Sequence, residues 1–353
     1  MIKVDIKFDF DDLLIVPISL SNIKSRKDVN LFDINGMLPL FTAPMDTVIS
    51  TKNLEIFRKN KIYPIIPRTI KSFDSNEWIA LGLKDFKELF IEQKIVFEKK
   101  NILIDIANGN MNILINYIKI SKNMYKDKLI LMVGNIANPE TYKLLSEAGA
   151  DFVRTGIGNG GGCLTSQNVG IGYPLASLIN ECYKISCQLE NPAKIVADGG
   201  MKNYSDIIKA LALGADFCIL GSIFNRALES AGETFKANIK HIGVENWTEP
   251  GEPVDQYSDN VKNAFENGAK FYKKFRGMST KSVQKILGNT ELKTSEGVTR
   301  MNPVEYTVEG WTENFRHYLA SAMSYTGKKT LKDFIGNVNL VRISYNSFNR
   351  FNK

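Results

Sequence analysis

Short apolar runs alternate with helical patterns along the first two thirds of the chain. Each run is rich in branched and aromatic residues, ends near Gly, Asn, Asp or Pro, and is followed by a segment with helical spacing. We count eight such runs, at residues 38–44, 62–67, 78–83, 101–107, 129–135, 151–157, 194–200 and 216–222. Most are apolar throughout rather than alternating, which is typical of parallel strands covered on both faces. The pattern therefore predicts repeated βα units.

Eight consecutive βα units predict a single closed (β/α)8 TIM barrel that occupies residues 1–353. In such barrels the chemistry lies in the loops that follow the strands, and the loop after the sixth run is enlarged. The pattern changes after the eighth run. Residues from about 232 to 300 are expected to form an insertion and a flap, with a helix from about 259 to 274. The tail from residue 297 is expected to be mostly irregular, with one helix near residues 312–323.

Composition agrees with a large globular protein and narrows the choice of partners. The chain has 353 residues, of which 44% are hydrophobic and 24% charged, and a net charge of +7. Because Lys and Arg are mixed with 38 acidic residues, the net charge mostly indicates a solvated surface, with some bias towards anionic small molecules and no nucleic acid polymer as partner. The four cysteines lack CxxC spacing, which argues against zinc and disulfides. We find no membrane-spanning run and no secretion signal, so we expect a cytoplasmic protein without a membrane partner.

Glycine-containing clusters follow the last three predicted strands. Residues 156–163 (GIGNGGGC) place five glycines ahead of Cys163, and such a loop can form a phosphate nest or a carbonyl-lined cation site. Residues 197–200 (ADGG) add a carboxylate that suits sugar hydroxyls, and residues 220–222 (LGS) end the strand whose loop often holds phosphate in barrels. Taken alone, each cluster is equally compatible with an ordinary turn, and Cys163 with a small buried side chain.

The chain resembles the family that contains IMP dehydrogenase and GMP reductase. The resemblance rests on motifs that occur in order over nearly the whole length: FDFDDLLIVP, SRKDVNL, APMDTV, VGN, GIGNGGGC, ADGG, LGS, RGMS, EGV and SYTG. It implies a purine nucleotide monophosphate as substrate and Cys163 as the nucleophile that forms a covalent thioimidate at C2 of the base. It also implies that Thr165 and Glu296 move protons around the entering or leaving group.

The same resemblance implies the remaining site residues and a homotetramer. Substrate contacts are expected from Asp198, Gly199, Gly200, Gly221, Ser222, Gly277, Met278, Ser279 and Gly297. Dinucleotide contacts are expected from Arg68, Asp105, Ile106, Ala107, Ser324 and Gly327, and from Ser25 and Arg26 of a neighbouring subunit. The carbonyls of Gly158, Gly160 and Cys163 are expected to bind K⁺.

Within this family the chain resembles the GMP reductases most. Residues 104–109 (IDIANG) and 170–174 (GIGYP) are similar to reductase motifs, and no Arg-Tyr pair occurs in residues 277–296. Only residues 68–77 join the second and third runs, so we expect no CBS regulatory domain. The resemblance implies NADPH-dependent reductive deamination of GMP to IMP. Three alternatives stay open: an IMP dehydrogenase without its regulatory domain, which makes XMP with NAD; an enzyme for a modified purine nucleotide; and a non-catalytic nucleotide-binding barrel.

The chain departs from the family pattern around the cysteine. Where the family has Pro-Gly-Ser before that residue, this chain has Asn159, Gly160 and Gly161, so the serine that ordinarily contacts the substrate phosphate is missing. The threonine pair and the arginine after it are also changed, to Leu164, Thr165 and Ser166. RGM and SAMSYTG are closer to the dehydrogenases. Phosphate binding must therefore be rebuilt here, or the ligand differs.

Overall fold

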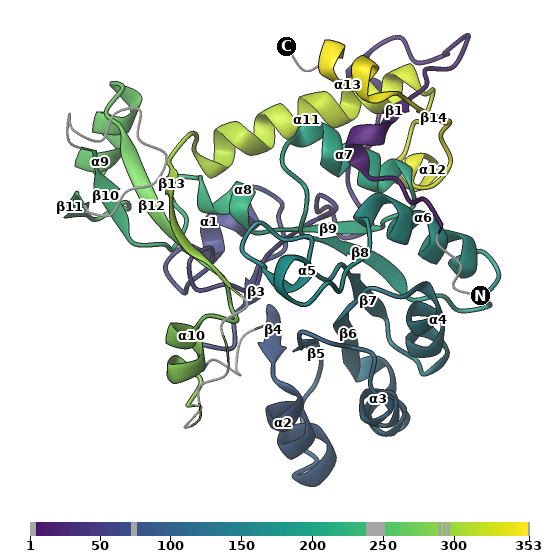
Figure 1. Cartoon of the computed structure of the whole chain (residues 1–353), viewed down its shortest axis with the longest axis vertical. Helices are drawn as coiled ribbons and strands as arrows, with labels where there is room; N and C mark the ends of the chain where they lie inside the picture. The colour runs from purple at the N-terminus through teal and green to yellow at the C-terminus, as the bar shows by residue number, and fades with distance from the viewer. Residues whose placement is uncertain are drawn as a thin grey trace.

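Eight parallel strands form the centre of the protein in a computed structural model that describes residues 5–71, 76–237, 251–288, 291, 294 and 297–351. The strands are β2 (Leu40–Thr42), β3 (Ile65–Ile66), β4 (Trp78–Leu81), β5 (Lys100–Asp105), β6 (Leu129–Ile136), β7 (Phe152–Thr155), β8 (Lys194–Asp198) and β9 (Phe217–Leu220). Their order is β2-β9-β8-β7-β6-β5-β4-β3, and a parallel bridge between Phe41 and Tyr63 joins the two ends. Each of the eight predicted runs overlaps one strand, which confirms the (β/α)8 barrel (Figure 1).

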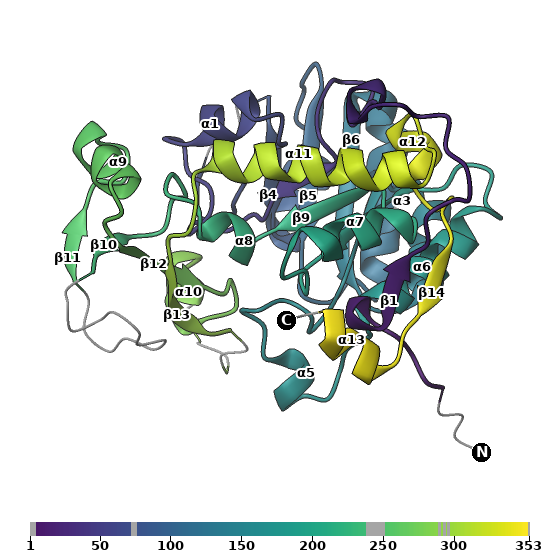
Figure 2. The ribbon, with the colours of Figure 1, turned by 90° about the horizontal axis from the view of Figure 1, so that it is seen from above.

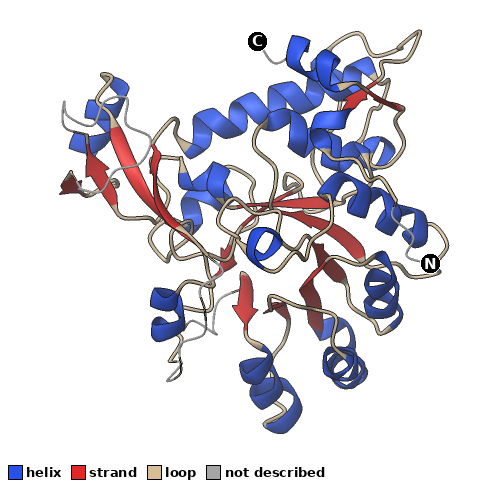
Figure 3. Ribbon diagram, viewed as in Figure 1, coloured by secondary structure: helices blue, strands red, loops and turns tan. Residues whose placement is uncertain are grey.

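Helices surround this barrel, as Figure 3 shows. They are α1 (Leu54–Lys59), α2 (Leu83–Phe86), α3 (Asn112–Tyr125), α4 (Pro139–Glu147), α6 (Leu175–Ser186), α7 (Tyr204–Ala212) and α11 (Val308–Tyr325), with short helices α5 (Thr165–Asn168) and α8 (Ser222–Asn225) in the loops. The helix starts follow sequence signals: Asn138 accepts a hydrogen bond from the Glu140 N–H with Pro139 in the first turn, and Asn203 caps α7 in the same way. Among the helices of the described ranges, none has both the length and the apolarity that crossing a membrane requires.

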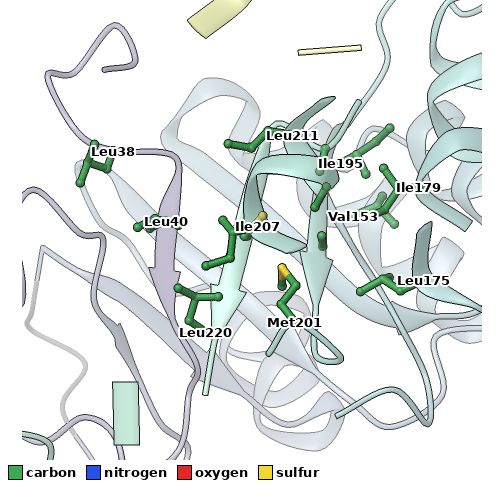
Figure 4. Packing of buried hydrophobic residues seen from close by; sticks show 14 of the residues in the cluster. Leu38, Leu40, Val153, Leu175, Ile179, Ile195, Met201, Ile207, Leu211 and Leu220 are labelled. Atoms are coloured by element: carbon green, nitrogen blue, oxygen red, sulfur yellow. The ribbon is translucent and has the colours of Figure 1, made fainter. Parts of the chain in front are cut away.

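Alternate residues of the strands fill two separate cores. In β5, Leu103 points into the barrel, whereas Ile102 and Ile104 pack against the helices, because successive side chains of a strand face opposite sides. Figure 4 shows part of the outer core, in which Val153 and Ile195 from the strands meet residues of α6 and α7. Residues on both faces are therefore apolar, which explains the unbroken apolar runs of the sequence.

Aromatic rings fill the inner core at the end of the barrel where several strands begin. Trp78, Phe152 and Phe217 are the first residues of β4, β7 and β9, and Phe41 and Tyr63 join them. The Phe41 ring meets the Trp78 ring edge to face at 5.6 Å between centroids and the Phe217 ring at 5.2 Å. Because this end is packed with rings, the opposite end, where the strands terminate, is left for a binding site.

A four-stranded antiparallel sheet stands beside the barrel (Figures 1 and 2). It contains β10 (Thr234–Lys236), β11 (Glu252–Val254), β12 (Phe271–Arg276) and β13 (Thr299–Pro303), in the order β11-β10-β12-β13. The predicted helix over 259–274 is wrong in its second half. Helix α9 (Asp259–Glu266) ends before Gly268, which has a φ of +89°, and β12 follows with alternating buried and partly exposed residues.

The C-terminal tail contains more structure than the single predicted helix. The helix expected near 312–323 is present as the longer α11, and it is followed by α12 (Leu331–Phe334), β14 (Leu340–Arg342) and α13 (Tyr345–Phe351). Strand β14 pairs antiparallel with β1 (Leu13–Ile15), so segments near the two ends of the chain lie side by side. The expectation of a mostly irregular tail was wrong because short elements of three to seven residues carry little periodicity.

Lys273 of β12 is fully buried where the four-stranded sheet meets the barrel. Its ammonium donates to the carbonyls of Leu228 at 2.8 Å and Ser230 at 2.6 Å. Burial lowers the pKa of Lys273 to about 7, and the nearby charge of Glu229 only partly opposes this shift. The unfolded chain therefore binds one more proton than the folded chain between about pH 7 and pH 10.5, the ordinary value.

This titration predicts a pH-dependent stability. Because a depressed lysine pKa penalises folding at low pH, the free energy of unfolding should rise between about pH 7 and pH 9, and Lys273→Met should flatten that rise. Denaturant titrations at several pH values measure the slope. Lys274→Met is the matched control, since the adjacent Lys274 is partly exposed and pairs with Glu233 at 2.8 Å. Equal slopes for the wild-type protein and Lys273→Met would contradict the assignment.

Candidate active site

Cys163 lies on the loop that joins β7 to α6, at the end of the barrel where the strands terminate. Its side chain is partly buried, and its thiol donates to the Thr165 hydroxyl at 3.2 Å. Thr165 begins α5, which lies over the centre of the barrel in Figure 1. The structure thus brings together two of the three predicted catalytic residues at the mouth of the barrel. The third, Glu296, lies outside the described residues.

Glycines allow the cysteine loop to contact the backbone of the loop after β8. Gly156 has a φ of +128°, and a side chain there would collide with the Asp198 carbonyl. Gly199 has a φ of +78°, and a Cβ there would lie 2.9 Å from the backbone of Gly160. The predicted ADGG segment is therefore in direct contact with the loop that carries Cys163, and only glycine permits this approach.

Gly277, Gly297 and Val298 pair with one another or with the loop that carries Cys163. Cys163 and Gly297 form an antiparallel bridge, and the Val298 N–H donates to the Gly162 carbonyl at 3.2 Å. The Gly277 N–H in turn donates to the Val298 carbonyl at 2.9 Å. Two predicted substrate contacts, Gly277 and Gly297, thus lie beside the nucleophile, with Met278 and Ser279 following Gly277 ahead of α10 (Lys281–Ile286).

A buried arginine connects two of the predicted site carboxylates. Arg154 of β7 donates from Nε to Asp198 at 3.0 Å and from Nη1 to Asp105 at 2.6 Å, and its side chain is only 10% exposed. Asn135 adds a second donor to Asp198, at 2.7 Å. Burial by itself would lower the pKa of Arg154, but the charges of Asp198 and Asp105 outweigh burial and raise it. The guanidinium therefore stays charged and fixes both carboxylates.

Arg154 and Asn135 were not predicted as site residues. The sequence signal was a single cation within an apolar run that becomes a buried strand, because a buried charge requires a partner. The only signal for Asn135 was its place in the VGN motif, near the end of β6, and this signal is weaker. Identifying the partners of Arg154 required the barrel itself, which places the ends of β5, β7 and β8 together.

The predicted dinucleotide residues fall into two groups. Arg68 donates to the Asp105 carbonyl at 3.3 Å, and Ile106 and Ala107 follow directly, so these four residues adjoin the Arg154 network. The second group lies near the end of α11 next to α12, away from α5, which follows Cys163 in its loop (Figure 2). There Ser25 caps the short helix at Arg26–Asp28, the Ser324 carbonyl accepts from Ser21 at 3.0 Å, and Gly327 contacts Ile18. One chain alone does not bring the two groups together.

Two of the three carbonyls predicted for K⁺ already accept hydrogen bonds within the loop. The Gly158 carbonyl accepts from Ser166 at 3.0 Å, and the Gly160 carbonyl from the Cys163 N–H at 2.9 Å. An open pocket of about 340 Å³ adjoins this part of the loop and is lined by Gly158, Asn159, Ser166 and residues 170–174. Because each carbonyl has a second lone pair, the donor set still suits a monovalent cation.

The remaining predicted contacts follow β8 and β9. Gly200 has a φ of +73° and packs against Asn159. Gly221 and Ser222 follow β9, and the Ser222 hydroxyl accepts from Arg300 Nη2 at 3.3 Å. Three loops, after β7, β8 and β9, therefore converge at one mouth of the barrel, with a thiol, a carboxylate and a hydroxyl among their side chains.

Comparison with known proteins agrees with this geometry. A family model described as IMP dehydrogenase / GMP reductase domain matches residues 84–244. A GMP reductase from Buchnera aphidicola subsp. Schizaphis graminum is 29% identical, with 97% of this chain and 96% of that protein aligned. GMP reductase from Caenorhabditis elegans is 29% identical over 96% and 92% of the two chains, and human GMP reductase 1 is 27% identical over 97% of each. The matched domain and the relatives aligned over nearly the whole length agree with the barrel and its cysteine loop: the chain is similar to the IMP dehydrogenase/GMP reductase domain and to proteins named GMP reductase.

Proposed function

We propose that the protein is a purine nucleotide oxidoreductase that converts GMP to IMP with NADPH. The observation that carries this proposal is the Cys163 thiol, which lies 3.2 Å from the Thr165 hydroxyl at the mouth of the barrel, in a chain that aligns over 97% of its length with a relative named GMP reductase. A thiolate at this position can attack a ring carbon of a bound nucleotide, and the adjacent hydroxyl can relay a proton.

The proposed reaction begins with a covalent step at C2 of the base. The Cys163 sulfur forms a bond to C2, the bond from C2 to the exocyclic amino nitrogen breaks, and ammonia leaves after that nitrogen gains a proton. Thr165 and Glu296 carry that proton. A hydride then reaches C2 of the resulting thioimidate, the S–C2 bond breaks, and the thiolate is restored as IMP forms. NADPH supplies the hydride and is oxidised to NADP⁺.

The residues around the thiol support binding of a ribose phosphate. Asp198 is fixed by Arg154 and Asn135, so its second carboxylate oxygen can accept from ribose hydroxyls without reorientation. Gly199, Gly200, Gly221 and Ser222 present backbone and a hydroxyl to the phosphate, and Gly277, Met278, Ser279 and Gly297 lie on the side of the base. Preorganised donors of this kind stabilise developing charge more than flexible ones.

The chain also suits a dinucleotide and K⁺, the two groups that the family resemblance implies. Arg68 has a buried Nε with no hydrogen-bond partner among the described residues, which fits an anionic or carbonyl-bearing dinucleotide beside Asp105, Ile106 and Ala107. Gly158, Gly160 and Cys163 would hold K⁺ through carbonyl oxygens and so stiffen the cysteine loop. We further propose a homotetramer, in which Ser25, Arg26, Ser324 and Gly327 complete a dinucleotide site across a subunit boundary.

Absorbance of the reduced nicotinamide tests the proposed function directly. Protein mixed with GMP and NADPH should lose this absorbance, and the loss should require both compounds. Protein mixed with IMP and NAD⁺ is the parallel reaction, and a gain of absorbance there with no loss in the first mixture would identify a dehydrogenase instead. Silence in both mixtures, with GMP still raising the melting temperature, would identify a nucleotide-binding barrel without turnover.

A further inference from the structure

Arg300 of β13 projects from the four-stranded sheet to the mouth of the barrel. Its Nη2 lies 3.3 Å from the Ser222 hydroxyl, and its guanidinium lies over the Phe275 ring of β12 at 5.1 Å from the ring centroid. Arginine stacks well on an aromatic face, which fixes the plane of the guanidinium. Three separate elements thus set the position of this cation.

The guanidinium lies beside Gly161, the loop position at which the IMP dehydrogenase and GMP reductase family has a serine. A Cβ built at Gly161 would lie 3.2 Å from Arg300 Nη2, so the two groups are neighbours. In the family that serine contacts the substrate phosphate, and here it is missing. A cation therefore occupies the space next to the lost hydroxyl, with the Ser222 hydroxyl on its other side.

Among the described residues, no carboxylate pairs with Arg300. Other arginines of this region have carboxylate partners: Arg154 has Asp105 and Asp198, Arg276 has Asp46, and Arg226 has Glu305. Within the described part of the chain, Arg300 forms no ion pair, and its Nε is buried without a hydrogen-bond partner. Burial, and then the charge of Arg226, lowers the pKa of Arg300. A bound anion would stabilise the charge of a partly buried guanidinium that has no carboxylate partner among the described residues.

We propose that Arg300, together with the Ser222 hydroxyl, binds the phosphate of the nucleotide monophosphate in place of the missing loop serine. A guanidinium can donate two parallel hydrogen bonds to a phosphate, which a serine hydroxyl cannot. A side chain at Gly161 would lie close to the guanidinium, since a Cβ there would be 3.2 Å from Nη2. This inference rests on the proposed function, because it takes a phosphorylated purine nucleoside as the ligand.

The test compares GMP with guanosine, which differ only by the phosphate. Arg300→Met keeps an unbranched side chain against Phe275 but removes the charge. Because a hydrogen bond to a charged group contributes about 1.5–3 kcal/mol, GMP affinity should fall about 10- to 100-fold, while guanosine affinity stays unchanged. Calorimetric titration of each ligand gives both affinities, and adding Gly161→Ser to Arg300→Met should recover part of the GMP affinity.

The controls separate this inference from a structural effect and from the proposed function. Arg316→Met is the matched control, since Arg316 also lies over a phenylalanine ring, at 5.3 Å from Phe32, and it should leave both affinities unchanged. Undiminished GMP binding by Arg300→Met, or equal losses for GMP and guanosine, would overturn the phosphate assignment. If the wild-type protein fails to consume NADPH with GMP but Arg300→Met still loses GMP binding selectively, the proposed function fails and the phosphate assignment stands.

Discussion

Replacing Cys163 by alanine should reduce turnover of GMP by at least about a thousandfold and leave GMP binding close to that of the wild-type protein. The reason is that the proposed reaction proceeds through a bond between Sγ and C2, and no other cysteine can replace that sulfur. Cys182 and Cys218 are buried, and burial strongly raises the pKa of both thiols. The rate is measured from nicotinamide absorbance and binding from calorimetry.

Cys187 provides the matched control for this substitution. It is the exposed cysteine at the end of α6, and Cys187→Ala should leave turnover unchanged. Mass spectrometry of the wild-type protein mixed with GMP alone adds a second measurement, because a covalent adduct should be trapped on the peptide that contains Cys163. Turnover that survives in Cys163→Ala would end the covalent mechanism.

Replacing Arg154 by methionine should lower the free energy of unfolding by about 3–5 kcal/mol. Methionine fills much of the same space, but it leaves the carboxylates of Asp105 and Asp198 without a cation while they remain only 14% and 16% exposed. Uncompensated charges of this kind are costly because burial removes their hydration. Denaturant titration at neutral pH measures the change.

Arg226 shows how much of that effect comes from burial. Its ion pair with Glu305 has a similar length, 2.6 Å, but the two side chains are 37% and 40% exposed. Because exposed pairs are screened by water, Arg226→Met should cost less than about 1 kcal/mol. Similar losses of stability for the two variants would show that the Arg154 network is not the buried cluster that the geometry indicates.

The barrel could be predicted from the sequence because parallel strands buried on both faces leave an unmistakable pattern. Runs such as residues 101–107 and 129–135 are largely apolar and end at or next to an Asn, and these runs overlap β5 and β6. The second half of the 259–274 segment misled the prediction because FYKKFR mixes apolar and basic residues in a way that fits both a helix face and an alternating strand. Its pairing with β10 and β13 decides the outcome, and that pairing is non-local.

The catalytic loop was accessible to sequence reasoning, whereas the charges around it were not. Cys163, Asp198 and Ser222 lie at or shortly after the ends of predicted strands, and the family resemblance implied their roles, which stay predictions. Arg154 and Arg300 have no motif, and their significance depends on partners that are distant in sequence, such as Asp105 and Phe275. Contacts between residues far apart along the chain are set by three-dimensional packing, which local periodicity does not encode.

The aromatic rings at one end of the barrel lie far from the loops at the other end, so stability and specificity can be changed separately. Phe41, Trp78, Phe152 and Phe217 seal the end opposite Cys163, so a substrate has no route through the barrel axis. Substitutions among these rings should therefore change thermal stability without contacting the reacting atoms. Substitutions in the loops at the other end should instead change which base is bound. Protein engineers can therefore substitute residues at the two ends of this barrel independently.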